Sequence, residues 1–289
     1  MNQPTTSASS MAYTANPWQA AFSLCQRECL RFFRQRNRVI GAIGQPILFW
    51  LLFGAGMNRM FRLEDQSFSE YYFPGTMVLI LLFTAIFATI SIIEDRKEGF
   101  LQSVLVAPSP RWSMVLGKIL GGAVIALVQA LVFLLLSLTL GIRFGFGTGI
   151  VIVVWLFVSA VALTALGFVL AWRMESTQGF HAIMNLLLMP MWLLSGAFFP
   201  IPKIGVENGG GFVESMMHWI MRCNPVTYVV SGFRRLLYAD MPEMVGALGE
   251  SRVWVPGMTS CWIVVVGFAV VMYAFAWRMA GRHTAGDLL

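Results

Sequence analysis

Charged side chains are scarce in this 289-residue chain, where Asp, Glu, Lys and Arg together make up 12% of the residues. A soluble globular domain carries about 25% charged residues, because its whole surface meets water. Hydrophobic residues form 57% of the chain, and the mean hydropathy is +0.71. The charges cluster between long apolar runs, so much apolar surface must face something other than water. This pattern excludes a soluble domain and predicts an all-α integral membrane protein that crosses the bilayer several times.

The chain also lacks the sequence patterns of nucleotide and metal sites. It has no Gly-x-x-x-x-Gly-Lys-Ser/Thr loop, so it does not bind ATP in the way of a P-loop protein. Its four cysteines show no Cys-x-x-Cys spacing, its three histidines lie far apart, and no His-Glu-x-x-His motif occurs. We therefore expect no metal, no cofactor and no catalytic residue in this chain. Residues 1–16 lack the apolar core of a secretory signal, and we expect a disordered cytosolic tail there.

Six apolar stretches are long enough to cross about 30 Å of hydrocarbon at about 1.5 Å per residue. The first is the weakest, because two glycines, a glutamine and Pro46 interrupt it. The predicted spans, within a transmembrane domain of residues 39–280, are Val39–Met57, Phe73–Ile93, Gly117–Leu140, Gly149–Trp172, Ala182–Ile201 and Met258–Trp277.

The connections between the spans predict their orientation, because Lys and Arg concentrate on the cytoplasmic side of a membrane protein. With a cytosolic N-terminus, most basic residues of the short connections fall inside. Both termini, including the tail 281–289, are then cytoplasmic, and residues 202–257 form an external loop. The net charge of +6 is explained by basic residues on the cytoplasmic side, where they meet anionic lipid headgroups. We therefore expect the lipid bilayer as a partner and no nucleic acid.

The segment 17–38, before the first span, has apolar and basic residues on opposite sides of a helical wheel. This arrangement predicts an amphipathic helix that lies in the cytosolic membrane interface with its apolar side toward the lipid. The alternative is a plain anchor that only sets topology. The apolar side holds Trp18, Phe22, Cys25, Cys29 and Phe33, and the basic side holds Arg27, Arg31, Arg34 and Arg38.

A charged run followed by apolar residues at helical spacing connects the second and third spans. It predicts a short cytosolic helix over residues 94–107, which prolines then end. A helix with one apolar edge and a charged start suits docking into a groove of a soluble partner, although it could also lie on the membrane. The candidate docking residues are Glu94, Asp95, Arg96, Lys97, Glu98, Gly99, Phe100, Leu101, Leu105 and Pro108.

This segment resembles the signature of the type-2 ABC exporter permeases, the family that exports polysaccharides, lipids and drugs. The resemblance covers about residues 18–280, and its first motif continues into Leu116-Gly117-Lys118. A second motif, Ser195-Gly196-Ala197-Phe198-Phe199-Pro200, is similar to the Ser-Gly-x-x-Phe-Pro that closes the fifth span in the family. A third, Asn224-Pro225-Val226-Thr227-Tyr228 with Arg234 downstream, is similar to the segment before the last span. The chain departs from many relatives in having Ser231-Gly232 where they have an acidic residue.

The resemblance implies a permease subunit of the bacterial inner membrane that is powered by a separate ATP-binding subunit. ATP and magnesium would then bind to that partner, and the permease would form a homodimer or a close heterodimer. The segment 94–107 would be the coupling helix, and the helix 17–38 would be a second contact with the ATPase. Short re-entrant helices between Val206 and Leu237 would cap the pathway, with Asn224-Pro225 opening the last of them and Tyr228 within it.

Polar residues inside the spans are candidates for contact with the exported substrate, although such groups usually hydrogen-bond to neighbouring helices. An uncharged path favours an amphiphilic, lipid-linked or drug-like substrate. The candidates are Gln129, Asn185, Trp192 and Ser195.

Two other functions stay open at this point. An ion-coupled secondary transporter usually has an ionisable residue within a span, and none lies deep in a predicted span here. A permease-like membrane scaffold without transport is the other alternative.

Overall fold

The computed structural model describes residues 16–57, 68–107, 109–202, 211–241 and 254–281, and within these ranges the chain forms helices and no strand. Pro108, the tails 1–15 and 282–289, and parts of the predicted external loop lie outside the described residues. The helices are α1 (Pro17–Arg34), α2 (Arg36–Met57), α3 (Phe68–Ala88), α4 (Ile90–Lys97), α5 (Phe100–Val106), α6 (Arg111–Leu134), η1 (Leu135–Leu140), α7 (Phe146–Trp172), α8 (Thr177–Trp192), η2 (Leu193–Ala197), α9 (Phe212–Cys223), α10 (Pro225–Leu237) and α12 (Met258–Gly281).

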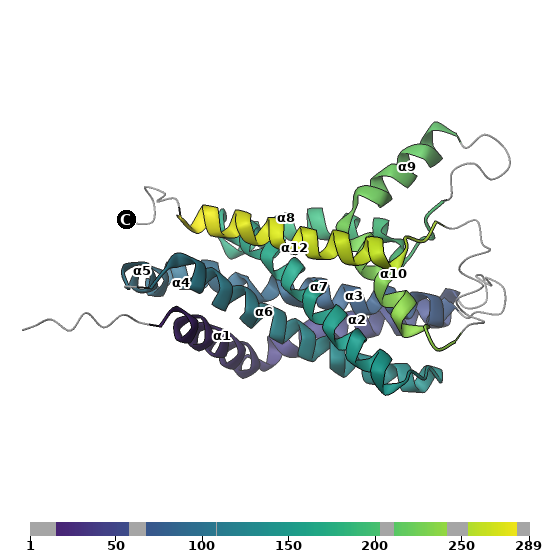
Figure 1. Cartoon of the computed structure of the whole chain (residues 1–289), viewed down its shortest axis with the longest axis horizontal. Coiled ribbons are helices and arrows are strands. Elements are labelled where there is room, and N and C mark those ends of the chain that lie inside the picture. The colour runs from purple at the N-terminus through teal and green to yellow at the C-terminus, as the bar shows by residue number, and fades with distance from the viewer. Residues whose placement is uncertain (1–15, 58–67, 108, 203–210, 242–253, 282–289) are drawn as a thin grey trace, which may run out of the picture.

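Six helical segments are long and apolar enough to cross a membrane, which confirms the predicted number of spans. They are Arg36–Met57, Phe68–Lys97, Arg111–Leu140, Phe146–Trp172, Thr177–Ala197 and Met258–Gly281. The first continues through Pro46 as a single helix. The second is longer than predicted and reaches Lys97, so that it includes Asp95. The segments run side by side along the long axis of the molecule (Figure 1).

The second span lies at the centre of the bundle. Helix α3 packs against α2, α6 and α7, and almost all of its side chains are buried. Small residues let the neighbouring helices approach closely. A Cβ on Gly122 of α6 would lie 2.5 Å from the Thr164 Cγ2 of α7, and one on Gly75 of α3 would lie 2.7 Å from the Ala197 Cβ. By contrast, few side chains of α2 and α12 are fully buried in the bundle.

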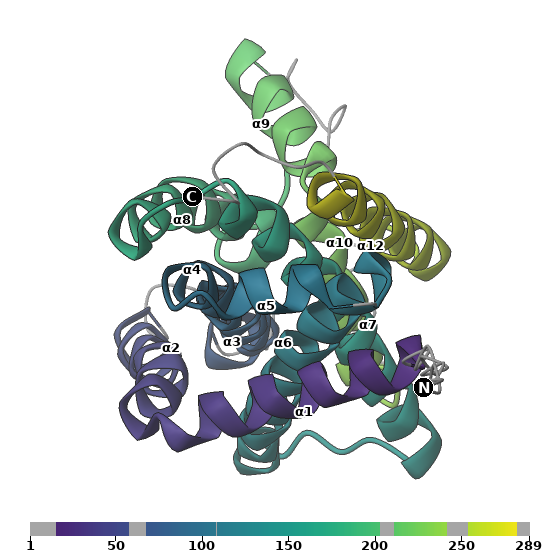
Figure 2. The same ribbon diagram turned by 90° about the vertical axis from the view of Figure 1, so that its left-hand side faces the viewer.

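Helix α1 crosses one end of the bundle, which we call the α1 end (Figure 2). It packs chiefly against α6, where Gly117 leaves room for its backbone: a Cβ there would lie 2.6 Å from the Ala21 carbonyl oxygen. The predicted helix 17–38 is too long, because α1 ends at Arg34 and Arg36 and Arg38 belong to α2. Trp18 and Phe22 are exposed, as expected for an apolar side toward lipid, and the membrane-interface location stays a prediction.

The opposite end, which we call the α9 end, carries two short helices. Helix α9 projects from the bundle, whereas α10 packs between η2, α7 and α12 (Figure 1). The side chain of Asn224 accepts a hydrogen bond from the Val226 N–H at 3.0 Å, and Pro225 occupies the first turn of α10. The predicted start of the last short helix at Asn224-Pro225 is therefore confirmed. Residues 203–210 lie outside the described residues, and re-entry into the membrane stays a prediction.

Candidate functional site

The carboxylate of Asp95 is the centre of a buried charge cluster at the α1 end. Its side chain on α4 is 0% exposed and contacts three cations. Arg27 of α1 donates to it twice, at 2.8 and 3.1 Å, and Arg31 donates at 2.6 Å. Lys118 of α6 forms the third ion pair with Asp95. A carboxylate with three cationic donors keeps its charge in a site that excludes water.

Further ion pairs extend the cluster on both sides of Asp95. Lys118 also donates to Glu28 of α1 at 2.7 Å, and Arg38 of α2 donates to Glu94 at 2.8 Å. At the edge of the cluster, Arg31 reaches the exposed Glu98 at 3.1 Å. Four acidic and four basic side chains therefore balance one another, namely Glu28, Glu94, Asp95 and Glu98 with Arg27, Arg31, Arg38 and Lys118.

Arg27 and Arg31 of α1 therefore point toward α4, where their charges are paired with its carboxylates. The hydrogen bond from Arg27 to Asp95 raises the pKa of the Arg27 guanidinium above its ordinary value, and the charges of Asp95 and Glu28 act in the same direction. The helical wheel placed the basic residues on one side of α1, but it gave no sign that they contact α4. Glu28 is the signal that sequence reasoning missed: it is a single acidic residue on a basic helix, and it is buried.

Gly99 separates α4 from the short helix α5. Its φ of 74° lies in the left-handed region, and the Glu98 N–H donates to the Glu94 carbonyl at 2.9 Å as α4 ends. The predicted helix 94–107 is therefore two helices that meet at a turn. Leu101, a predicted docking residue, is 3% exposed, and its side chain packs in the core of the protein.

The outward side of α5 differs from the predicted docking edge. Phe100 is half-buried beneath Arg27, whose guanidinium carbon lies 3.6 Å from the centre of the ring. Leu105 is also half-buried, while Val106 is 83% exposed and Gln102 and Ser103 lie beside it on the same exposed side. Any partner that binds α5 from outside would meet these three side chains.

Arg96 points inward and joins α4 to the end of α7. It donates to the Trp172 carbonyl at 2.8 Å and to the Met174 carbonyl at 3.2 Å, which are near the C-terminal end of α7. Cations at this end of a helix satisfy carbonyls that have no partner within the helix. Of the five charged candidates in the segment 94–98, Lys97 and Glu98 are exposed, and Glu98 still pairs with Arg31, while the other three are buried or half-buried.

The second and third sequence motifs contact each other at the α9 end. The π-helix η2 breaks the regular helical hydrogen bonds around Ser195, and Gly196 there has a φ of 78°. Asn224 donates to the Met191 carbonyl at 2.5 Å, and the buried Arg234 donates to the Gly196 carbonyl at 3.0 Å. Asn224 of the Asn-Pro motif and Arg234 downstream of it thus bind carbonyls just before and within the Ser-Gly motif.

The Ser231-Gly232 pair, where the chain departs from the family pattern, contacts α7. A Cβ on Gly232 would lie 2.2 Å from Trp155 Cζ2, so the indole occupies the space of a side chain at that position. Trp155 also donates to the Val229 carbonyl at 3.2 Å. Tyr228, one turn before Gly232, is half-buried and has its ring centre 6.3 Å from that of Trp254.

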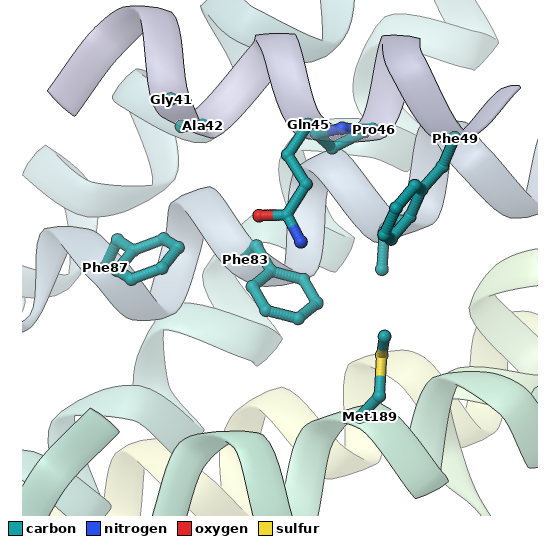
Figure 3. A pocket seen from close by; sticks show the side chains of 9 residues that line it. Gly41, Ala42, Gln45, Pro46, Phe49, Phe83, Phe87 and Met189 are labelled. Atoms are coloured by element: carbon teal, nitrogen blue, oxygen red, sulfur yellow. The ribbon is translucent and has the colours of Figure 1, made fainter. Parts of the chain in front are cut away.

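The four candidate substrate-path residues do not share one site. Gln129 is buried and accepts a hydrogen bond from Thr84 at 2.6 Å, and Trp192 donates to the Gly75 carbonyl at 2.8 Å. Ser195 is buried and donates to the Trp192 carbonyl at 2.5 Å, whereas Asn185 is exposed on α8. None of them lines the pocket between α2, α3 and α8 that Figure 3 shows.

Comparison with known proteins gives consistent matches over most of the chain. A family model described as ABC-2 type transporter matches residues 19–238. A protein from Cyanophora paradoxa named "Putative transport permease ycf38" is 27% identical over 223 residues, which cover 75% of this chain and 74% of the relative. The protein of the same name from Porphyra purpurea is 23% identical over 220 residues, covering 73% and 72%.

The family match begins within α1, ends at the residue after α10, and so includes the charge cluster, the turn at Gly99 and the contact between η2 and α10. Five of the six candidate spans lie inside it. The resemblance inferred from the three sequence motifs is therefore confirmed, and the chain is a multi-pass membrane permease that belongs to the ABC-2 type transporter family.

Proposed function

We propose that this chain is the transmembrane subunit of an ATP-driven exporter and that α5 is the contact for a separate ATPase. The observation that carries the proposal is the outward side of α5, where an exposed Val106 lies on a segment held by buried ion pairs. A mobile surface loop could not transmit a push to the spans. A short helix that is fixed to a charge cluster can transmit a displacement to the spans.

The contacts of α4 suggest how such a push would spread. Asp95 binds α1 and α6, and Arg96 binds the end of α7, so a displacement of α4 acts on three other helices. Helix α4 also continues the central helix α3 after a single turn at Thr89. Binding and hydrolysis of ATP by the partner would therefore bias the packing of the spans between two arrangements.

The assembly and the substrate follow from the same proposal. Two permease chains, identical or closely related, would pair with two ATPases that bind ATP and magnesium. The substrate would be an amphiphilic, lipid-linked or drug-like molecule that leaves the cytoplasm. Purification in mild detergent with the cognate ATPase, followed by mass measurement, tests the assembly. A monomer that transports without any ATPase would contradict it.

The exporter would lie in a bacterial inner membrane with both termini cytoplasmic. In that orientation the α1 end faces the cytoplasm and the α9 end faces outward, because Lys and Arg mark the inner side. A reporter active only outside the cytoplasm should give no signal after Leu289 and a strong signal at residue 210. The reverse result would place α5 on the wrong side for a cytosolic ATPase.

Substitution of Val106 tests the proposed ATPase contact. Val106→Asp adds a charge to an exposed position, so the fold should survive while an apolar docking contact is lost. Val106→Thr is the matched control, because it keeps the branched shape and adds no charge. We expect Val106→Asp to reduce co-purification of the ATPase and ATP-dependent transport at least tenfold, and Val106→Thr to have little effect. Normal coupling in Val106→Asp would leave α5 as a surface connector and favour a different contact or a scaffold role.

A further inference from the structure

A hollow lined by arginines lies at the junction of α1 and α2, and Figure 2 shows these two helices meeting at one edge of the bundle. Its volume is about 420 Å³, and it is open to the surroundings. A water molecule takes up about 30 Å³ of liquid, so the hollow has room for a polar group several times larger. The described residues that line it include no carboxylate: they are Arg27, Leu30, Arg31, Arg34 and Gln35. This basic lining favours an anionic ligand.

Arg34 supplies an unpaired positive charge to this hollow. Arg27 and Arg31 pair with Asp95, within a cluster whose opposite charges balance one another. Arg34 is exposed, and no carboxylate in the described part of the chain pairs with it. A guanidinium has five N–H groups, so Arg27 and Arg31 can still donate from groups that their ion pairs do not use. A phosphate in the hollow would therefore meet three guanidinium groups, one of which has no other anion.

The contacts between α1 and α6 indicate the depth of the hollow. Trp18 at the start of α1 contacts Trp112 at the start of α6, and their ring centres are 5.1 Å apart. Toward the other end of α1, Phe32 belongs to one buried cluster with Ile125 of α6. Ile125 lies about 20 Å farther along α6 than Trp112. Helix α1 therefore descends along the third span, so its C-terminal half, with the hollow, lies toward the bilayer.

Exposed apolar side chains surround Arg34. Leu30 and Phe33 of α1 are exposed, and so is Ile40 in the second turn of α2. A lipid supplies both parts of a matching partner, namely a phosphate for the guanidinium and acyl chains for the apolar side chains. We propose that this hollow binds the headgroup of an anionic phospholipid in the leaflet at the α1 end, with Arg34 binding the phosphate. This inference goes beyond the proposed function, because it requires neither an ATPase nor an exported substrate.

Native mass spectrometry of the permease in mild detergent tests the proposal. The probes are palmitoyl-oleoyl phosphatidylglycerol, which is anionic, and phosphatidylcholine with the same acyl chains, which has no net charge. We expect a single phosphatidylglycerol to be retained by each chain, with an affinity at least roughly fivefold higher than that of phosphatidylcholine. Equal retention of the two lipids would overturn the proposal.

Variants of Arg34 locate the binding. Arg34→Gln removes the unpaired charge and leaves the buried ion pairs intact, so the fold should survive and the Kd for phosphatidylglycerol should rise roughly fivefold. Arg34→Lys keeps the charge and should retain most of the binding. Arg173→Gln is the matched control, because Arg173 is exposed at the same end, directly after α7, but does not line the hollow. Equal losses in Arg34→Gln and Arg173→Gln would show unspecific attraction of lipid to this end and would overturn the proposal.

Two competition experiments separate a lipid from other anionic partners. Glycerol phosphate carries the same phosphate without acyl chains, so an excess of it should leave the phosphatidylglycerol bound. Displacement by glycerol phosphate would make the hollow a site for soluble anions and overturn the proposal. The cognate ATPase should also leave the lipid bound: loss of the lipid when the ATPase co-purifies would make the hollow a protein contact and overturn this inference alone. Retained lipid without any co-purified ATPase would contradict only the proposed function.

Discussion

Asp95 of α4 and Lys118 of α6 form an ion pair in which both side chains are almost completely buried. Lys118 continues to Glu28 on α1, so one ammonium group links two carboxylates from different helices. Removal of one member of a buried ion pair is strongly destabilising, because the partner charge stays behind without compensation. The pair therefore holds three helices at the end of the bundle where we place the ATPase.

Asp95→Asn should lower the free energy of unfolding by about 3–5 kcal/mol, since three cations would lose their central carboxylate. Glu98→Gln is the matched control: this residue also pairs with Arg31, but its side chain is 59% exposed, and the expected loss is below about 1 kcal/mol. Denaturant titration of the purified variants in detergent measures both losses of unfolding free energy. Equal losses for the two variants would show that burial of Asp95 adds nothing to the cluster.

The loss of stability in Gly99 variants should depend on the cost of a left-handed backbone at this position rather than on side-chain volume. A Cβ at Gly99 would meet no atom within 4 Å, so only its φ of 74° opposes a larger residue. Gly99→Ala should cost about 1–2 kcal/mol, and Gly99→Val should cost more because its side chain is β-branched. Gly99→Asn should be the mildest, because asparagine tolerates this region. Thermal unfolding and ATPase co-purification measure the order of the three variants. A loss of stability that increases with residue size alone would contradict the explanation from backbone conformation.

Gly232→Ala should destabilise the contact between α10 and α7, because the new methyl group would overlap the indole of Trp155. Overpacking of this kind costs about 1–3 kcal/mol. Gly267→Ala on α12 is the control, since a Cβ there meets no atom within 4 Å and alanine favours a helix. Combination of Gly232→Ala with Trp155→Phe should recover part of the loss. Equal stability of the two single variants would indicate that Trp155 can move without cost.

Cys25 should react with N-ethylmaleimide as an unusually acidic thiol. A hydrogen bond from Cys29, one helical turn away on α1, lowers the pKa of Cys25 to about 7. The thiolate is the reactive form, so the alkylation rate should rise with pH through a midpoint near 7. In Cys29→Ala the hydrogen bond is lost, and the midpoint should move up toward the ordinary thiol pKa of about 8.5. Peptide mass spectrometry assigns the labelled residue, and an unchanged midpoint in Cys29→Ala would contradict this cause.

Residues near one another in sequence gave the most reliable predictions. Asn224-Pro225 predicted a helix start because capping and a proline in the first turn are local properties, and α10 begins there. For Leu101, helical spacing identified an apolar side but not the partner of that side. In the folded chain that partner is the protein core.

The sequence by itself determined the membrane character, the six spans and the family, because apolar run length and local motifs need no knowledge of distant contacts. Only the tertiary structure decided which charges meet. Arg27 and Asp95 are 68 positions apart, Lys118 and Glu28 are 90 apart, and no local pattern relates them. The same holds for the hollow at the junction of α1 and α2, whose depth follows from the packing of Phe32 with Ile125. Burial and pairing are properties of packed surfaces, so they exist only once the helices have come together.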